Sequence, residues 1–268
     1  MASTKKKKAK APVQPKAKSA VAAVREGKSG AKRPGALWDN IKGIGGAVLL
    51  FLFLRTFLVE AYRIPSPSMV PALLVGDWLF VNKLVYGPHI PFTGINLPGY
   101  SEPKRYDIAV FVSPNQVDQP EDPTPTLVKR IIGLPGDTLY MRSARLFVNG
   151  VEQKQGYGDQ SPPGDPDEVS FLFDWQKQYS LKESRFGPAP EQPTHDNWGP
   201  LVIPPRYYFM MGDNRYQSKD SRYWGIVPRE NFRGRPMFVY YSWNQDDSDR
   251  PLPMITDIRW GRIFHRIR

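Results

Sequence analysis

The chain has 268 residues and carries 37 Lys and Arg against 26 Asp and Glu, a formal net charge of +11 at pH 7. Residues 1–34 account for nearly all of this excess, because they hold eleven basic side chains and one acid, Glu26. The near-neutral remainder argues against a nucleic-acid-binding body, which presents a basic face. The chain has no cysteine, so disulfides and thiolate metal sites are excluded.

Residues 1–36 are expected to form a disordered basic tail. They are rich in Lys, Ala, Pro, Ser and Gly and almost free of large apolar side chains. Such a composition buries too little surface to offset the entropy of ordering. The lysine cluster of residues 5–8 suits anionic lipid or nucleic acid, but a solvated tail accounts for it equally well, and no nucleic-acid partner is predicted.

Residues 37–62 are predicted to form a transmembrane anchor. Segment 44–54 is wholly apolar or glycine, and with its flanks it reaches about 20 residues, the length that spans a bilayer. Arg55 lies near the far end, where its stem can snorkel, while Trp38 and Tyr62 occupy positions typical of interfacial aromatics. The basic tail predicts a cytoplasmic N-terminus. A cleavable signal peptide and a buried core helix are the alternatives.

After residue 62 the apolar pattern becomes alternating, and short runs punctuated by Gly and Pro predict an all-β body. The fold class is therefore mainly β, with an N-terminal transmembrane helix. The predicted strands are residues 76–83, 106–112, 126–133, 138–148, 207–211 and 235–242, with Asn149 and Gly150 as a hairpin turn. Residues 151–205 are polar and Pro-rich, and we interpret them as a β or loop insertion to which the sequence assigns no role.

A proline-rich strip of residues 64–71 follows the anchor and contains Ser66 and Ser68. Proline fixes its own φ and pushes the preceding residue toward extended geometry, so both serines are expected on a stiff extended strip rather than in a helix. A stiff strip suits a hydroxyl that must meet a substrate carbonyl. An ordinary Pro/Ser loop after a hydrophobic helix is the alternative.

A nucleophilic serine in this chain needs a base other than histidine. His89, His195 and His265 are far apart in sequence and show no triad or metal-ligand spacing, so no metal site is predicted. A lysine can serve, since burial lowers its pKa. Lys129 is the best candidate because apolar residues flank it on the same strand face, and Lys83, at the end of its run, is weaker. A lysine that snorkels to solvent is the alternative.

Residues 212–225 form a dense polar string directly after an apolar strand. Within it Asp220 and Arg222 can form an ion pair, and Ser218 can hydrogen-bond an amine. The alternative is a β-turn followed by ordinary surface charge.

These blocks resemble those of the bacterial type I signal peptidases (leader peptidases), membrane-anchored Ser-Lys proteases that remove signal peptides from exported proteins. The matching stretches, in the family's order, are residues 65–71, 76–83, 105–111, 129–137 and 212–225. The resemblance implies a signal-peptidase-like catalytic domain over residues 63–268 and no cofactor. It also implies preprotein signal peptides and the lipid bilayer as partners. The protein is expected to cross the inner (plasma) membrane once, with its catalytic domain on the extracytoplasmic side.

The resemblance also implies a role for each matching residue. Ser68 matches the nucleophile and Lys129 the general base. The supporting positions are the oxyanion hole (Ser66), the residue that orients the lysine (Ser218), an ion pair (Asp220 and Arg222) and substrate contacts (Ile64 and Met69). Pro67 departs from the family, which usually has glycine there, and it reduces backbone freedom beside the nucleophile.

Two other functions share part of this sequence pattern. A self-cleaving repressor protease shares the Ser-Lys β core, but it needs a DNA-binding domain, which residues 1–62 do not offer. A non-catalytic, membrane-anchored β-domain that acts as a binding or assembly module is the main alternative. Cleavage of a preprotein separates that module from a peptidase.

Overall fold

The computed structural model describes residues 36–90, 93–154, 167–246 and 248–267. The predicted disorder of the basic tail lies outside these residues, and so does the expected interfacial place of the Trp38 side chain. Contacts divide the chain into two units, residues 1–45 and 46–268.

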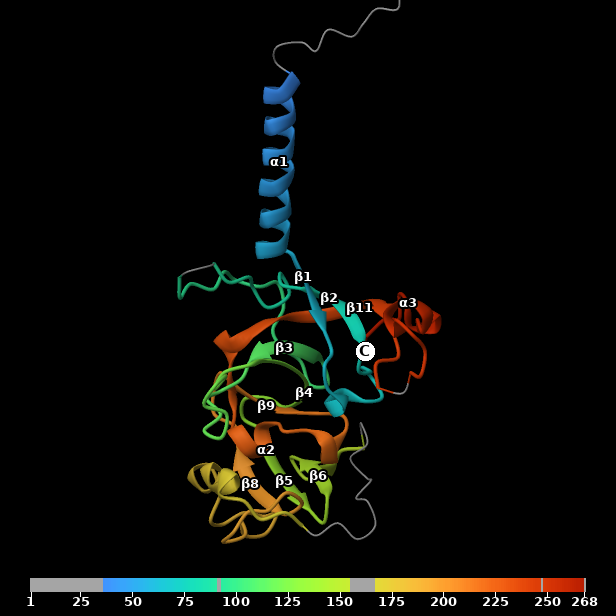
Figure 1. Ribbon diagram of the computed structural model, residues 1–268. Helices are drawn as coiled ribbons and strands as arrows, with labels where there is room; N and C mark the ends of the chain where they lie inside the picture. The colour runs from blue at the N-terminus through green and yellow to red at the C-terminus, as the bar shows by residue number, and fades with distance from the viewer. Residues whose placement is uncertain (1–35, 91–92, 155–166, 247, 268) are drawn as a thin grey trace, which may run out of the picture. The chain divides into compact units, whose positions relative to one another are not determined.

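The first helix, α1, spans Ala36–Phe57 (Figure 1). Within it, Asn40–Phe57 is long and apolar enough to cross a membrane, with a mean hydropathy of 1.4, and it is the single such span among the described residues. No part of that span is buried, which disfavours a core helix. The helix is shorter than the predicted anchor, because the chain from Val59 to Arg63 pairs with a neighbouring strand. Tyr62 consequently packs against a core cluster.

Two antiparallel sheets form the β body, which confirms the mainly β fold class (Figure 1). The seven-stranded sheet has the order β1-β2-β11-β3-β4-β9-β10, and the four-stranded sheet has the order β7-β6-β5-β8. The strands of the first are β1 (Val59–Arg63), β2 (Asp77–Asn82), β3 (Ile108–Val112), β4 (Thr126–Gly133), β9 (Tyr207–Met211), β10 (Val227–Pro228) and β11 (Phe232–Ser242). Those of the second are β5 (Thr138–Arg142), β6 (Arg145–Val148), β7 (Val151–Glu152) and β8 (Trp198–Val202).

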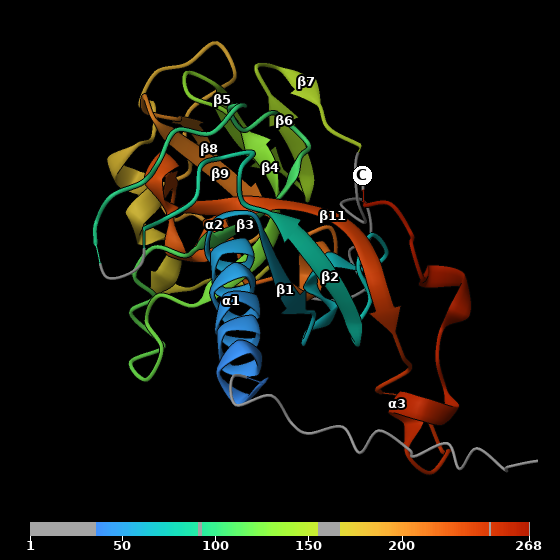
Figure 2. The ribbon, with the colours of Figure 1, turned by 90° about the horizontal axis from the view of Figure 1, so that it is seen from above.

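The two sheets lie toward different ends of the β body. In Figure 1, β5, β6 and β8 gather at the opposite end of the body from β1 and β2. Figure 2 shows β11 as a long strand beside β2, with which it pairs. The helices after α1 are short: η1 (Pro67–Met69), η2 (Phe171–Gln178), η3 (Arg215–Gln217), α2 (Ser221–Trp224), η4 (Arg229–Asn231), α3 (Pro253–Thr256) and η5 (Trp260–Arg262).

One predicted strand, residues 138–148, is instead a hairpin. It divides at Ser143 and Ala144, which adopt positive φ values of 48° and 65°, so that Arg142 lies opposite Arg145. Neither residue is the Asn, Asp or Gly that usually adopts positive φ in a two-residue hairpin turn, which is why the sequence pattern missed this turn. The predicted turn at Asn149 and Gly150 is confirmed, with φ values of 53° and 90°, and it joins β6 to β7.

The insertion predicted at residues 151–205 contributes two strands and part of the core. It holds β7, η2 and β8, and β8 pairs with β5 in the second sheet. Trp198 and Leu201 of β8 are completely buried in one apolar cluster with Phe209 of β9. Burying a large apolar side chain contributes roughly 1.5–3 kcal/mol, so the insertion stabilises the body that it joins.

Candidate active site

Ser68 lies in η1, a single 3-10 turn, so the predicted extended strip is wrong over Pro67–Met69, and the chain is extended again at Val70. Of the two serines only Ser66 is extended, with φ −135° and ψ 156°, as expected of a residue before proline. Pro67 begins the turn, because its fixed φ suits the first helical position and its missing N–H would have no helical partner there. The proline in the family's glycine position therefore starts the turn that carries Ser68.

The Ser68 hydroxyl and the Lys129 amine face each other. Lys129 Nζ lies 2.6 Å from Ser68 Oγ in a hydrogen bond, although the two residues are 61 positions apart in sequence. Ser68 is 7% exposed and Lys129 is 4% exposed. Lys129 belongs to β4. Because its side chain is buried, it does not snorkel to solvent. The fold brings together the two residues for which the sequence predicted a nucleophile and a base.

Burial lowers the pKa of Lys129 from 10.5 to about 8, because removing water destabilises the charged amine. The Asp220 carboxylate acts in the opposite direction, the Arg222 guanidinium lowers the pKa again, and Asp213 raises it. A lysine with this pKa is neutral in a large fraction of molecules at slightly alkaline pH, and a neutral amine can accept a proton.

The two other predicted serines lie beside this pair. Ser66 Oγ is 3.3 Å from Ser68 Oγ, in a hydrogen bond. Ser218 is buried, and its hydroxyl has no hydrogen-bond partner within the described residues. The predicted bond from Ser218 to Lys129 is therefore absent from this structure, and the role of Ser218 in orienting the lysine stays a prediction.

Gly212 makes the close approach of these segments possible. A Cβ atom at this position would lie 2.2 Å from Ser218 Oγ and 2.5 Å from the Ser68 carbonyl oxygen, and real Cβ atoms do not tolerate such contacts. The backbone after β9 can therefore contact η1 only because residue 212 has no side chain.

Gly212→Ala should consequently displace Ser68 or Ser218. Because a misplacement of about 1 Å can cost about 10²-fold in rate, we expect kcat/KM to fall by about that factor or more. The measurement is the peptidase rate of the folded variant, with thermal melting as a check. Gly94→Ala is the matched control, since nothing lies within 4 Å of its added Cβ. Equal rates for both variants would contradict the packing argument.

Asp220 and Arg222 form the predicted ion pair. Arg222 Nε donates to Asp220 Oδ1 at 2.8 Å and Nη2 donates to Oδ2 at 2.8 Å, and both side chains are fully buried. Asp220 also caps α2 by accepting from the Arg222 backbone N–H, and it accepts from the Gly212 N–H at 3.1 Å. The pair thus holds the backbone that packs against Ser68.

Comparison with known proteins places this arrangement in a family. The signal peptidase family, peptidase S26, matches residues 37–243. The chain belongs to this family. Signal peptidase I of Pseudomonas aeruginosa is 36% identical over 212 residues, covering 73% of this chain and 69% of that protein. Signal peptidase I of Leptolyngbya laminosa is 34% identical over 224 residues, covering 83% of this chain and 88% of that protein.

A crystal structure of a signal peptidase I from Enterococcus faecalis is also similar in sequence. It is 28% identical and covers 50% of this chain and 97% of that chain, with a TM-score of 0.31. The family match and the two relatives, without this structure, confirm the resemblance inferred from the five ordered blocks at the level of the family, and the chain is a peptidase.

Sequence reasoning missed a second buried ion pair in this peptidase. Arg130 follows Lys129 on β4, and its Nε and Nη2 bond to the two Asp213 oxygens at 2.7 and 2.6 Å. The pair ties the loop after β9 to β4. Both residues lie in blocks that match the family, and strand alternation turns Arg130 to the opposite face from Lys129. That alternation was a usable signal, but no sequence pattern showed which acid Arg130 meets.

The remaining predicted residues lie in other surroundings. Lys83 pairs with Glu60 at 3.2 Å and donates to the Arg55 carbonyl oxygen, so its described partners are not site residues. Ile64 and Met69 are buried in an apolar core cluster, and their role in substrate binding stays a prediction. Among the described residues, no group of three or more His, Asp or Glu side chains is placed to hold a metal ion.

Proposed function

We propose that the chain is a membrane-anchored serine endopeptidase that cleaves N-terminal signal peptides from exported preproteins with a Ser68–Lys129 dyad. The observation that carries the proposal is the 2.6 Å contact between the Lys129 amine and the Ser68 hydroxyl, in a chain that belongs to the signal peptidase family. A buried lysine of lowered pKa beside a serine is the arrangement that nucleophilic catalysis without histidine requires.

The chemistry is acyl transfer. The neutral Lys129 amine accepts the Ser68 hydroxyl proton as Oγ attacks the scissile carbonyl carbon. The Ser68 N–H and the Ser66 hydroxyl donate hydrogen bonds to the resulting oxyanion; the Ser68 amide is free for this because the first amides of a helix have no intrahelical acceptor. Lys129 then gives its proton to the leaving amine, and the acyl ester on Ser68 is hydrolysed by a water that Lys129 deprotonates.

The substrate is proposed to bind as an added β-strand. β1 is an edge strand of the seven-stranded sheet, and among the described strands it pairs with β2 only, so its other side can accept an extended peptide through main-chain hydrogen bonds. The chain leads from β1 directly to Ser66 and Ser68. The family resemblance implies small side chains at the first and third positions before the cleaved bond, with Ile64 and Met69 among the contacts.

Anchoring and orientation are part of the same proposal. The apolar side chains of α1 are exposed, among them Leu49, Phe51 and Phe53, and a helix that is apolar all round favours lipid. The basic tail favours a cytoplasmic N-terminus. Residues 63–268 then form the extracytoplasmic catalytic domain at the inner (plasma) membrane.

Incubation of the detergent-solubilised full chain with a preprotein tests the function. We expect one cut, after a small-x-small sequence, that the Ser68→Ala variant does not make. The alternative binding module would retain the preprotein without cutting it. Absence of a cut by the folded wild-type chain would overturn the proposal.

The pH dependence of kcat/KM tests the base. Below its pKa of about 8, Lys129 carries a proton and cannot accept another, so kcat/KM should fall about tenfold for each pH unit below that value. Above it the amine is neutral and the rate should level off. The measurement is kcat/KM from pH 5 to about 10 on one signal-peptide substrate. A flat profile is incompatible with a lysine base.

A further inference from the structure

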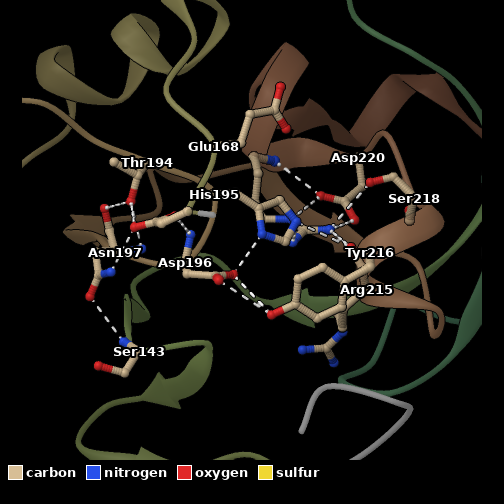
Figure 3. A network of polar contacts seen from close by, with 12 residues as sticks. Ser143, Glu168, Thr194, His195, Asp196, Asn197, Arg215, Tyr216, Ser218 and Asp220 are labelled. Atoms are coloured by element: carbon tan, nitrogen blue, oxygen red, sulfur yellow. Dashed lines mark hydrogen bonds and ion pairs between the residues drawn. The ribbon is translucent and has the colours of Figure 1, made fainter. Parts of the chain in front are cut away.

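Arg222, the partner of Asp220, is held in place by a side chain from the insertion. Besides its two bonds to Asp220, its Nη2 donates to the Arg215 carbonyl oxygen at 2.6 Å. Its Nη1 bonds to Nε2 of His195, a buried histidine just before β8. Figure 3 shows the His195 ring between Asp196 on one side and Asp220 on the other.

The contact with Arg222 assigns a role to each nitrogen of the His195 ring. A guanidinium can only donate hydrogen bonds, so Nε2 of His195 must accept from Arg222. The single proton of the neutral ring then lies on Nδ1, which donates to Asp196 Oδ1 at 2.6 Å. Tyr216 supports this acceptor, because its hydroxyl donates to Asp196 at 3.2 Å. His195 Nε2 also lies 3.3 Å from the Arg215 carbonyl oxygen, which already accepts from Arg222 Nη2 at 2.6 Å.

The charge that His195 helps to hold acts on Lys129. Three charged groups act on the amine: Asp220 and Asp213 favour its protonated form, and Arg222 opposes it. Asp213 is itself paired with Arg130. When Arg222 lies on both oxygens of Asp220, the two charges largely cancel at Lys129. If Arg222 withdrew, the uncompensated Asp220 carboxylate would favour the protonated amine, which cannot act as a base.

We infer that His195 is a positioning residue of this peptidase, which holds the Arg222 guanidinium on Asp220. The guanidinium then offsets the negative charge of Asp220, which would otherwise favour the protonated form of the Lys129 amine. The inference rests on the proposed Ser68–Lys129 function. It also gives the insertion a role, namely to brace the polar loop that packs against Ser68.

Other contacts of the insertion support this role. Trp175 Nε1 and Gln176 Nε2 of η2 both donate to the Arg222 carbonyl oxygen, at 2.9 and 3.1 Å. The backbone N–H of His195 donates to the Glu168 carbonyl oxygen at 3.0 Å, which fixes the histidine within its own segment. The insertion therefore holds Arg222 by its backbone and by its side chain.

Two substitutions of His195 separate the contact with Arg222 from the contact with Asp196. The carbonyl oxygen of His195→Gln reaches the place of Nε2 and can accept from Arg222. The shorter His195→Asn reaches only the place of Nδ1, so it keeps a donor for Asp196 and loses the acceptor for Arg222. The acid limb of the profile is the fall of kcat/KM at low pH, and its midpoint reports the pKa of Lys129. We expect this midpoint to stay at about pH 8 in His195→Gln. In His195→Asn the midpoint of the acid limb should rise by about one pH unit, because a nearby opposite charge shifts a pKa by at least about that much.

The shift has a signature that a merely structural role would not give. At pH 7, His195→Asn should lose about tenfold in kcat/KM through kcat, whereas above the displaced limb its rate should return to near the wild-type value. His89→Asn is the matched control, because His89 lies outside the site and contacts Arg233 at 3.3 Å. An unmoved limb in His195→Asn, or an equal loss at every pH, would overturn the inference.

If His195→Asn does not fold by thermal melting, Asp196→Asn decides the question. It weakens the acceptor that keeps the proton on Nδ1, so the limb should move in the same direction, and an unmoved limb would overturn the inference. Failure of the proposed function looks different. In that event the wild-type chain shows no acid limb or Ser68→Ala still cleaves, whereas failure of this inference alone leaves the wild-type limb intact.

Discussion

Lys129→Met should abolish preprotein cleavage while the chain remains folded. Methionine keeps an unbranched stem of similar length and removes the amine that takes the Ser68 proton. Removal of a general base that acts as a unit with its nucleophile costs about 10⁴-fold or more in kcat. The melting temperature should be no lower than that of the wild type, because burial of an amine opposes folding. The measurements are kcat/KM on one signal-peptide substrate and a thermal melt.

Lys83→Met is the matched control for this prediction. Lys83 also follows an apolar run, but it pairs with Glu60 at 3.2 Å. A partly exposed ion pair contributes at most about 1 kcal/mol, so kcat/KM should stay within about tenfold of the wild type. An active Lys129→Met beside an inactive, folded Lys83→Met would reverse the assignment of the base.

Ser68→Ala should lose cleavage to the same extent, by about 10⁴-fold or more, because no other group supplies the covalent step. The substitution removes one buried oxygen atom at the N-terminal turn of η1, and both Ser66 and Lys129 keep their places. The variant should still retain the preprotein, so binding and cleavage separate in a pull-down followed by product analysis. Wild-type turnover by Ser68→Ala would remove Ser68 from the mechanism.

Ser66→Ala provides the graded comparison. Ser66 Oγ lies 3.3 Å from Ser68 Oγ and is proposed to donate to the oxyanion, together with the Ser68 N–H. Loss of one such donor costs about 10²–10³-fold in kcat. The variant should therefore be slower than wild type and clearly faster than Ser68→Ala. Equal rates for Ser66→Ala and wild type would remove its hydroxyl from the oxyanion hole.

Much of the fold and the central pair of the site could be predicted from the sequence. Strand alternation placed Lys129 between apolar neighbours, and β4 spans the predicted 126–133. The uninterrupted apolar segment predicted the helix that became α1. These features depend on residues within a few positions of one another, so a local pattern is sufficient to show them.

Local reasoning was wrong where two local preferences competed. Proline excludes helix for the residue before it, but it also favours the first position of a turn, and the structure uses the second property at Pro67. The anchor was predicted to extend to residue 62 because the length needed to span a bilayer ends there, at an aromatic residue of the kind found at membrane interfaces. Pairing with β2 instead places Val59 opposite Asn82 in a strand.

The sequence by itself determined which groups could do chemistry: a serine between prolines, a lysine on an apolar strand face, and an acid and an arginine in one polar string. Only the tertiary structure decided how they meet. The Ser68–Lys129 contact spans 61 positions, the Arg130–Asp213 pair spans 83 and the Arg222–His195 contact spans 27. The burial that lowers the pKa of Lys129 likewise comes from elements distant in sequence. Such contacts depend on how the sheets and the insertion pack together, and no periodicity along the chain records that packing.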